Sequence, residues 1–412
     1  MNIEKVFQPI ESGNFFFGYY DKSQISICGQ YALSHKINFL DRYPNFNELS
    51  DVGYFKLLDN KFVPIEKTSA INYQQGSMLN WHSHNNIIFN QLKDHNYRST
   101  LIDMNGKIIE NIEAPIYSLA ENKKFFLTIN FYNLSKFKRG YGYDYNFDVN
   151  FKNYYHKPDE VGIWIYNFDK KKIIKLISSN EIHKDNECWI EHISISPDNF
   201  NYIFLLRYKL KDGGIRDKVF LSDTKKTKLI EIKTFSRGSH YNWIDKNSFI
   251  IYGGINNLLN KIRHNKYFQK IKYFKNLLKL YHKTVSHNSK ISKIITGDSY
   301  YIYNINSNDL IKLEAKFNLE DGHPSVDKIN KNILITDHYA DIENNKLPKL
   351  YIYDLINFKM IRELEFDSIS QLDNSGYRCD LHPRFASNSH VFSIDIFENS
   401  RRTFQVYKIS NY

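Results

Sequence analysis

The sequence predicts an all-β protein, a seven-bladed β-propeller formed by residues 1–412 as one domain. One observation is a recurring pattern: a polar or aromatic residue, a few further residues, a polar turn and then an apolar, β-rich run. A second is the set of additional short strands between the copies, such as VGIWIYNFD, KLYIYDL and TFQVYKI. Four-stranded units repeated around an axis form a propeller, so the pattern favours this fold.

The seven predicted units follow one another along the chain. They start near residues 21, 81, 117, 192, 240, 323 and 382. The first three read DKSQISICGQYALSHK, NWHSHNNIIFNQ and YSLAENKKFFLTINF, and the last four read EHISISPDNFNYIFLL, SHYNWIDKNSFIIYG, DGHPSVDKINKNILITD and DLHPRFASNSHVFSID. The irregular steps between them indicate insertions. A two-layer sandwich is the alternative, but seven units in a chain of this length exceed its usual size.

One segment, around residues 255–290, departs from the strand pattern. Its apolar residues recur at steps of four and three, which predicts one helical face. Eleven Lys or Arg and no Asp or Glu lie between 246 and 297, so this insertion carries the whole net charge of +11. A basic amphipathic helix over 255–285 can bind an anionic membrane surface. The alternative is a helix that packs its apolar face on the propeller rim. The face consists of Tyr267, Ile271, Phe274, Leu278 and Tyr281.

Composition excludes several classes of protein. No apolar stretch reaches the length of a transmembrane helix, and the N-terminus lacks the pattern of a secretory signal. Cys28, Cys188 and Cys379 do not make a disulfide framework. Because the basic excess is confined to one insertion, we expect no nucleic-acid partner. The sequence therefore predicts a cytoplasmic protein, free or peripheral at the inner membrane.

Four of the units place a histidine at the same point, and a radial fold brings such points to one axis. Cys379 and His382 form a C-x-x-H pair, and His240 and His323 belong to the two preceding units. Together these four side chains make a ligand set suited to Zn²⁺, with a structural role favoured by the cysteine. The plainer interpretation is that the histidines are polar residues at strand starts, bonded to backbone.

A second group of residues predicts proton transfer. His192 can exchange a proton near neutral pH, and Arg207 can neutralise a carboxylate. Tyr141 lies beside Arg139 in KRGYGYDY, where a nearby cation can activate a phenol. Simple loop packing is the alternative for Tyr141.

The stretch NYQQGSMLNWH offers groups for a sugar. Gln74 and Gln75 can hydrogen-bond hydroxyls, Trp81 can stack on a pyranose ring, and His82 lies next to it. The alternative is a polar turn at the start of a blade. The sequence has no Gly-rich phosphate loop and no nucleophile elbow.

Several of these motifs, taken as a set, resemble bacterial seven-bladed propellers related to ulvan lyases, and more distantly oligogalacturonate lyases. The motifs are FFFGYYDKS, LSHKINFLDRYP, NYQQGSMLNW, KRGYGYD, EHISISPD, GSHYNW, DGHPS, TDHYAD and RCDLHPR, and they span about residues 14–405. The resemblance implies β-elimination on a polysaccharide containing uronic acid. It places proton transfer on Tyr141 and His192, carboxylate neutralisation on Arg139 or Arg207, and the metal on His240, His323, Cys379 and His382.

Two departures keep other functions open. The relatives are exported, and where they have an early histidine pair this chain has Gln74-Gln75. We expect a lyase-like enzyme acting on an acidic saccharide, in the metabolism of a surface polysaccharide such as capsule or lipopolysaccharide. One alternative is a non-catalytic glycan-binding or scaffold protein at the inner membrane. Another is a glycosyl- or phospho-transferase, for which the chain has no phosphate motif.

Overall fold

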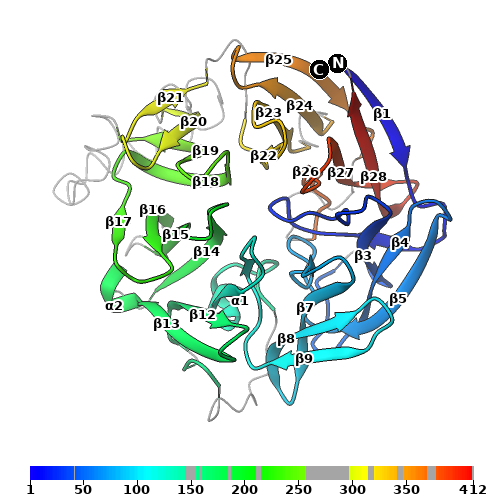
Figure 1. Cartoon of the computed structure of the whole chain (residues 1–412), viewed down its shortest axis with the longest axis horizontal. Coiled ribbons are helices and arrows are strands. Elements are labelled where there is room, and N and C mark those ends of the chain that lie inside the picture. The colour runs from blue at the N-terminus through cyan, green and yellow to red at the C-terminus, as the bar shows by residue number, and fades with distance from the viewer. Residues whose placement is uncertain are drawn as a thin grey trace, which may run out of the picture.

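Seven four-stranded antiparallel sheets surround one axis in the computed structural model of the chain, as Figure 1 shows. The all-β, seven-bladed prediction is confirmed. The structure describes residues 1–40, 42–143, 154–157, 159–183, 187–209, 215–256, 297–313, 320–340, 347–368 and 377–410.

The blades follow the chain in order, and Figure 1 shows β14, β18, β22 and β26 as the strands of their blades nearest the axis. Blades 1 to 3 consist of β2 (Asn14–Phe16), β3 (Tyr31–Ile37), β4 (Ser50–Lys56) and β5 (Lys61–Thr68); β6 (Asn80–Trp81), β7 (Asn86–Lys93), β8 (Asn96–Asp103) and β9 (Ile108–Ile112); β10 (Ser118–Leu119), β11 (Phe125–Ile129), β12 (Gly162–Asn167) and β13 (Lys172–Ser178). Blades 4 to 6 consist of β14 (Cys188–Ile195), β15 (Asn201–Lys209), β16 (Ile215–Asp223) and β17 (Leu229–Glu231); β18 (Phe235–Trp243), β19 (Ser248–Ile255), β20 (Asp298–Asn304) and β21 (Leu310–Lys312); β22 (Ser325–Val326), β23 (Ile333–His338), β24 (Lys349–Asp354) and β25 (Lys359–Glu365).

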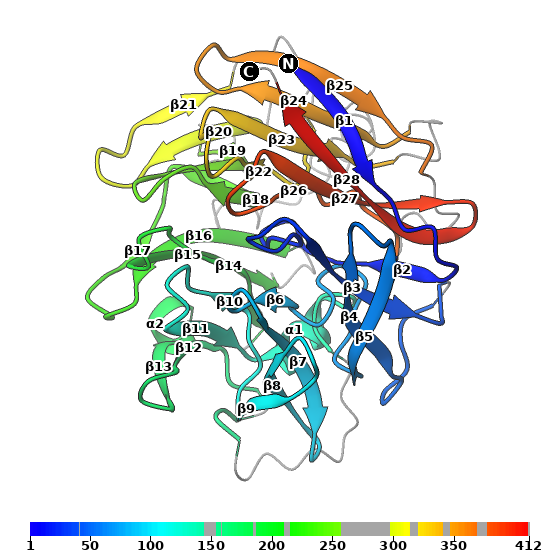
Figure 2. The same ribbon diagram turned by 45° about the vertical axis from the view of Figure 1, so that its right-hand side comes forward.

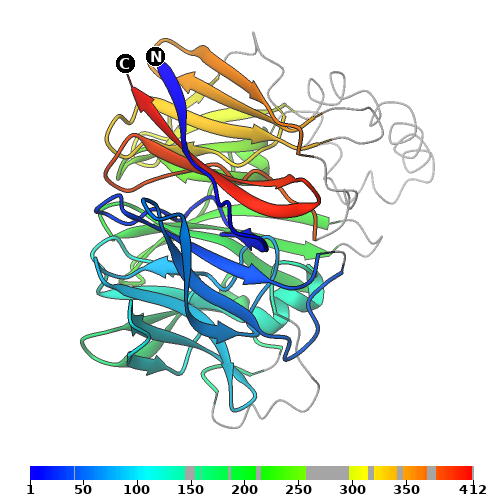
Figure 3. The ribbon, with the colours of Figure 1, turned by 90° about the vertical axis from the view of Figure 1, so that its right-hand side faces the viewer.

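Blade 7 joins the two ends of the chain. It contains β26 (Arg384–Phe385), β27 (Val391–Glu398) and β28 (Arg401–Ser410), and its outermost strand is β1 (Asn2–Phe7). The register runs antiparallel from Asn2 opposite Ser410. Figure 2 shows β1 along the outer edge of β28, and Figure 3 shows the termini side by side. This pairing closes the ring of blades.

Burial along the strands explains the sequence pattern. β11 and β23 are buried along their whole length, as expected for short apolar runs packed between neighbouring blades. The outer strands β21 and β25 are mostly exposed or half-buried. The apolar cores therefore lie between successive blades, and the polar residues at the inner strand ends are left to face the axis.

Two short helices, not expected from the sequence, accompany the strands. The helix α1 (Phe131–Phe137) starts at Asn130, whose side chain accepts a hydrogen bond from the Asn133 amide. The other, α2 (Ser179–Ile182), follows β13. Neither has the length and apolar character needed to cross a bilayer, and the search covers the described residues. The predicted basic helix at 255–290 lies almost entirely outside the described residues.

Candidate active site

The structure brings the four predicted histidines together on the propeller axis. Ring centroids are 5.1 Å apart for His192 and His240, 4.4 Å for His240 and His323, and 4.2 Å for His323 and His382. Tyr19 of blade 1 completes a circle, at 5.6 Å from His382 and 5.5 Å from His192. Five blades therefore each contribute one aromatic ring to a single cluster.

Blades 2 and 3 contribute the neighbouring polar groups. The Gln75 side chain donates to the Tyr117 hydroxyl at 3.1 Å, and that hydroxyl accepts from the His192 amide at 2.8 Å. All these side chains are buried. Together, one side chain from each blade forms what we call the axial ring: Tyr19, Gln75, Tyr117, His192, His240, His323 and His382.

Local backbone distortions aim these side chains at the axis. His192 and His382 have φ of 56° and 43°, a left-handed conformation that is uncommon outside glycine. In β14 the register shifts between Glu191 and Ser194, and β18 has a similar shift between Gly238 and Tyr241. A β-bulge re-aims a side chain that would otherwise alternate along the strand. Non-glycine residues persist in such backbone only where their surroundings hold them, often at functional sites.

Three axial groups are placed to hold a metal ion. His323, Asp380 and His382 each offer a ligand atom, and these atoms lie within 4.8 Å of one another. Asp337 orients two of them: its carboxylate is 2.9 Å from Nδ1 of His323 and accepts the backbone amides of His323 at 2.6 Å and His382 at 3.1 Å. A carboxylate bound to the far nitrogen of a ligating histidine is the usual support of such sites.

The donor set fits a divalent transition-metal ion. Because Asp337 occupies Nδ1 of His323, its Nε2 is the nitrogen left for a ligand, and it now contacts the Tyr339 hydroxyl at 3.3 Å. Nε2 of His382 is buried and has no hydrogen-bond partner within the described part of the chain. Two imidazoles and one carboxylate suit such an ion and leave coordination positions open. Nothing in this set selects zinc over manganese or iron.

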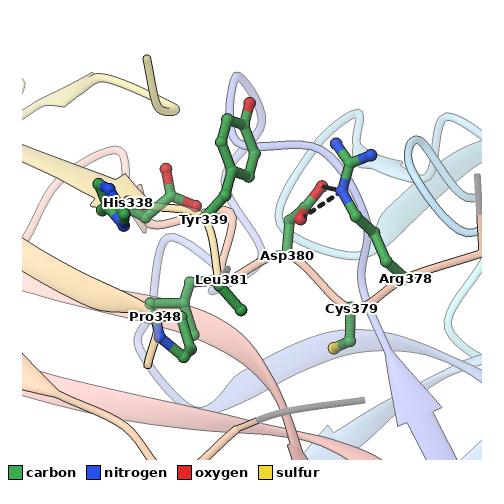
Figure 4. A pocket seen from close by; sticks show the side chains of 9 residues that line it. His338, Tyr339, Pro348, Arg378, Cys379, Asp380 and Leu381 are labelled. Atoms are coloured by element: carbon green, nitrogen blue, oxygen red, sulfur yellow. Dashed lines mark hydrogen bonds and ion pairs between the residues drawn. The ribbon is translucent and has the colours of Figure 1, made fainter. Parts of the chain in front are cut away.

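The structure places Cys379 outside this group, and Asp380 takes the place predicted for it. The candidate group contains Asp380 and His382 and not Cys379. In Figure 4 the Cys379 sulfur points away from Asp380. Burial also raises the pKa of the Cys379 thiol to about 12, which disfavours the thiolate.

His240 lies beside the three-residue group without belonging to it. Its Nδ1 is 3.1 Å from Asp321, and Ser239 donates to the same carboxylate at 2.6 Å. Burial lowers the pKa of His240 to about 3, so the ring is neutral. Because Asp321 occupies Nδ1, Nε2 is the nitrogen of His240 that could serve as a further ligand next to His323.

His192 is held at every polar atom. Its amide donates to Tyr117, its carbonyl accepts from Tyr241, Nδ1 meets the Tyr19 hydroxyl, and Nε2 lies 3.2 Å from the Glu191 carboxylate. Because a carboxylate can only accept, Nε2 carries the hydrogen and Nδ1 accepts from Tyr19. Burial lowers the pKa of His192 to about 4, so it is neutral near pH 7. The result is a tyrosine–histidine–glutamate chain.

Glu191 is the charged end of that chain. It is fully buried, yet nearby Arg207 and Lys138 outweigh the cost of burial and hold its pKa well below the usual value. Lys138 lies 3.1 Å away, and burial lowers the pKa of its amine to about 8. Arg207 binds Glu191 through Nε and Asp217 through a terminal nitrogen at 3.2 Å. Arg207 is thus committed to two carboxylates.

Tyr141 lies next to this network, while Arg139 does not. The Tyr141 ring is 6.1 Å from His192, and Lys138 sits over it at 3.8 Å. Burial raises the pKa of the Tyr141 hydroxyl. Arg139 is exposed and lies 4.3 Å from the Tyr43 ring.

The predicted sugar-binding residues are divided between two places. Gln75 belongs to the axial ring, and the Gln74 amide is fully buried without a hydrogen-bond partner among the described residues. Trp81 is buried between blades 1 and 2 and donates to the Gln24 carbonyl at 3.0 Å. His82 packs against the Phe168 ring. The structure does not bring Trp81 and His82 to the axial histidines.

Five residues of the site were not expected from the sequence. Asp380 precedes the predicted His382 by two residues in RCDLH, so a D-x-H pattern would have found it, whereas Asp337 in TDH precedes His338, which was not predicted. Tyr19 lies two residues from the start assigned to the first unit. Of the other two, Glu191 directly precedes His192, and Lys138 gains its importance from its contact with Glu191 of the next blade, which no local pattern reveals.

Protein-family models and curated proteins give no match to this chain. The chain is similar in fold to oligogalacturonate lyases. An oligogalacturonate lyase in complex with manganese matches with a TM-score of 0.61 at 11% identity, covering 100% of this chain and 96% of that one. The enzyme from Vibrio parahaemolyticus matches with a TM-score of 0.60 at 10% identity, covering 100% and 97%. At these identities the likeness shows the fold alone.

Proposed function

We propose that the protein is a metal-assisted lyase that cleaves an acidic saccharide containing uronic acid by β-elimination. The observation that carries this proposal is the contact between two groups on one axis. The candidate metal ligands His323, Asp380 and His382 adjoin Tyr19, whose hydroxyl is bonded to His192. The fold of manganese-bound oligogalacturonate lyase and the motifs that resemble ulvan lyases support the same reaction class.

The residues can perform each proton movement of the reaction. In β-elimination the proton next to the carboxylate leaves, a C=C bond forms, the glycosidic C–O bond breaks and the departing oxygen gains a proton. The Tyr19 oxygen can accept the first proton while its own proton passes to Nδ1 of His192, and Glu191 stabilises the imidazolium that results. Tyr19 can then protonate the departing oxygen and regain its proton from Nδ1 of His192. A divalent cation, when bound, supplies a Lewis acid for the substrate carboxylate.

The test separates metal binding from proton transfer. Purified protein is incubated with oligogalacturonate and other uronate oligosaccharides, and the unsaturated product is followed by its absorbance. His192→Gln should retain the metal and lose about 10²- to 10⁴-fold in kcat, whereas His382→Gln should lose both metal and activity. His390→Gln, a histidine on a blade 7 turn bonded to Asp327, is the matched control.

Two outcomes would contradict the proposal. One is wild-type protein that retains its metal and produces no unsaturated product from any uronate oligosaccharide. The other is a His192→Gln variant as active as the wild type. Saccharide binding without turnover would favour the alternative, a non-catalytic glycan-binding protein.

A further inference from the structure

A separate cavity opens beside the axial ring, between blades 6 and 7. It has a volume of about 220 Å³ and adjoins the candidate ligand Asp380 (Figure 4). Drug-sized ligands occupy pockets of roughly 300–1,000 Å³, so this cavity matches a single sugar ring rather than an oligosaccharide. Its lining includes His338, Tyr339, Ala340, Arg378, Cys379 and Asp380.

The Arg378 guanidinium lines this cavity, and within the described residues only one of its nitrogens, Nε, donates a hydrogen bond. Its Nε donates to both oxygens of Asp380, at 2.8 and 3.0 Å. Its terminal amino groups have no hydrogen-bond partner among the residues that the structure describes, and the guanidinium lies 5.2 Å from the Tyr339 ring. In Figure 4 these amino groups and the Tyr339 hydroxyl lie on the same side. A paired donor of this kind matches a carboxylate.

The other predicted carboxylate partners are unsuited to this role. Arg207 is already bound to Glu191 and Asp217, and Arg139 lies against Tyr43 away from the axis. Among the described residues, Arg378 therefore keeps terminal donors without a partner beside the candidate metal ligand Asp380.

His338 gives a second, independent sign of a ligand. Its Nε2 is 2.6 Å from Glu320, which fixes the hydrogen on that nitrogen. Its Nδ1 is buried and unpartnered within the described chain. A buried acceptor without a donor is costly, and a ligand hydroxyl would satisfy it.

We propose that this cavity is a subsite for one carboxylated sugar ring, with Arg378 pairing the carboxylate and Tyr339 and His338 contacting hydroxyls. The proposal rests on the proposed function for its substrate class. Because Arg378 also holds Asp380, a sugar bound there would place its carboxylate next to the candidate metal group. Selectivity for acidic sugars would then arise at Arg378.

The experiment compares the binding of galacturonate and galactose by calorimetry or ligand-observed NMR. These monosaccharides have no glycosidic bond, so binding is measured without turnover. Wild-type protein should prefer galacturonate. Arg378→Gln should weaken galacturonate binding by about 10- to 100-fold, the range expected for a charge-assisted pair, and leave galactose binding unchanged. Arg362→Gln, the same charge change on the exposed face of β25, is the matched control.

A second variant tests the location of the subsite. Ala340→Leu fills the cavity without touching the axial histidines, and it should weaken both sugars while metal content and thermal stability stay at the wild-type level. Equal wild-type affinity for the two sugars, or full discrimination retained in Arg378→Gln, would overturn the subsite. Intact discrimination with no lyase product would instead overturn the proposed function and leave the subsite standing.

Discussion

Asp337 acts on two candidate ligands at once, because its carboxylate fixes the His323 ring and the backbone of His382. Asp337→Asn should lower affinity for Mn²⁺ or Zn²⁺ by about 10- to 100-fold, since the amide is a poorer partner for a ligating imidazole. The measurement is a metal titration of stripped protein. Asp327→Asn is the control, because Asp327 is equally buried and binds His390, away from the axial ring. Similar metal affinity in wild type and Asp337→Asn would contradict the assignment.

His35, a buried histidine outside the axial ring, should make the stability of the folded protein depend on pH. It is fully buried, bonded to Ser77 at 2.8 Å and to the Phe16 carbonyl at 3.3 Å, and burial lowers its pKa to about 4. No carboxylate contacts the ring among the described residues. The unfolded chain therefore binds a proton near pH 6.5 that the folded chain refuses until about pH 4. Stability from this residue is complete above about pH 6.5 and falls as pH decreases.

Denaturant unfolding between pH 7.5 and 4.5 checks this sign. His35→Gln should be less stable than wild type at pH 7.5, yet its free energy of unfolding should fall less steeply, by up to about 1.4 kcal/mol per pH unit. The other buried histidines contribute to both proteins and cancel in the comparison. Parallel curves for the two proteins would show that His35 does not titrate on unfolding.

At the residue scale, sequence reasoning located the axial histidines but not all their companions. The repeat places a histidine at the same point of four units, and equivalent points of a radial fold lie close together at its axis. These residues are His192, His240, His323 and His382. The C-x-x-H spacing predicts that Cys379 and His382 share one centre, but the backbone at His382 is left-handed and the candidate group contains Asp380 instead of Cys379. Contacts such as that of Lys138 with Glu191 join distant segments and leave no local trace.

At the element scale, one buried arginine ties the N-terminal segment to blade 7. Arg384 bonds Asp395 of β27, the Gly18 carbonyl and the His382 carbonyl, and Asp395 accepts the amide of Phe17. The clamp thus fixes the approach of both Tyr19 and His382 to the axis.

Breaking this clamp should be far more costly than breaking a surface pair. Arg384→Met leaves the Asp395 charge buried and should destabilise the protein by about 3–5 kcal/mol. Lys349→Met, which removes the exposed pair with Glu363, should cost less than about 1 kcal/mol. Free energies of unfolding from urea titration test both values. If Arg384→Met lowered the free energy of unfolding as little as Lys349→Met does, the proposed role of this arginine in joining the two segments would be wrong.

The strands themselves were largely predictable, since short apolar runs bounded by polar turns mark all seven blades. The two starts that differ most from the axial ring are the first and second, near 21 and 81, where the ring residues are Tyr19 and Gln75. The innermost strand of blade 1 ends before Tyr19 and that of blade 2 begins after Gln75, so neither strand contains the residue that faces the axis. Where no apolar run marks a residue, sequence periodicity cannot find it.

At the scale of the whole molecule, the sequence predicted seven blades but not how the ring closes. The repeat pattern assigns β1 to no blade, because a six-residue strand that pairs with a strand near residue 410 leaves no repeat in the sequence. β1 pairs with β28 because the ring of blades brings the two strands together.

Removing residues 2–7 should weaken the whole ring. The deletion uncovers the edge of β28, and an unpaired edge strand promotes association. We expect a lower midpoint in urea and concentration-dependent dimers in size-exclusion chromatography. A synthetic peptide of residues 1–8 should restore the monomer by adding the missing strand. A monomeric deletion variant as stable as the full chain would show that closure by β1 is dispensable.

The pairing of β1 with β28 in blade 7 also delays the closing of the ring during biosynthesis. Asn2 is made long before its partner Ser410, because Ser410 lies far along the chain. At about 5–20 residues per second, β1 waits roughly 20–80 s for β28. During that interval the nascent chain is an open arc of blades whose first strand has no sheet to join. A permuted gene that encodes β1 directly after β28 would remove the wait, and we expect blade 7 of its product to be protected from proteolysis as soon as these two strands have been made.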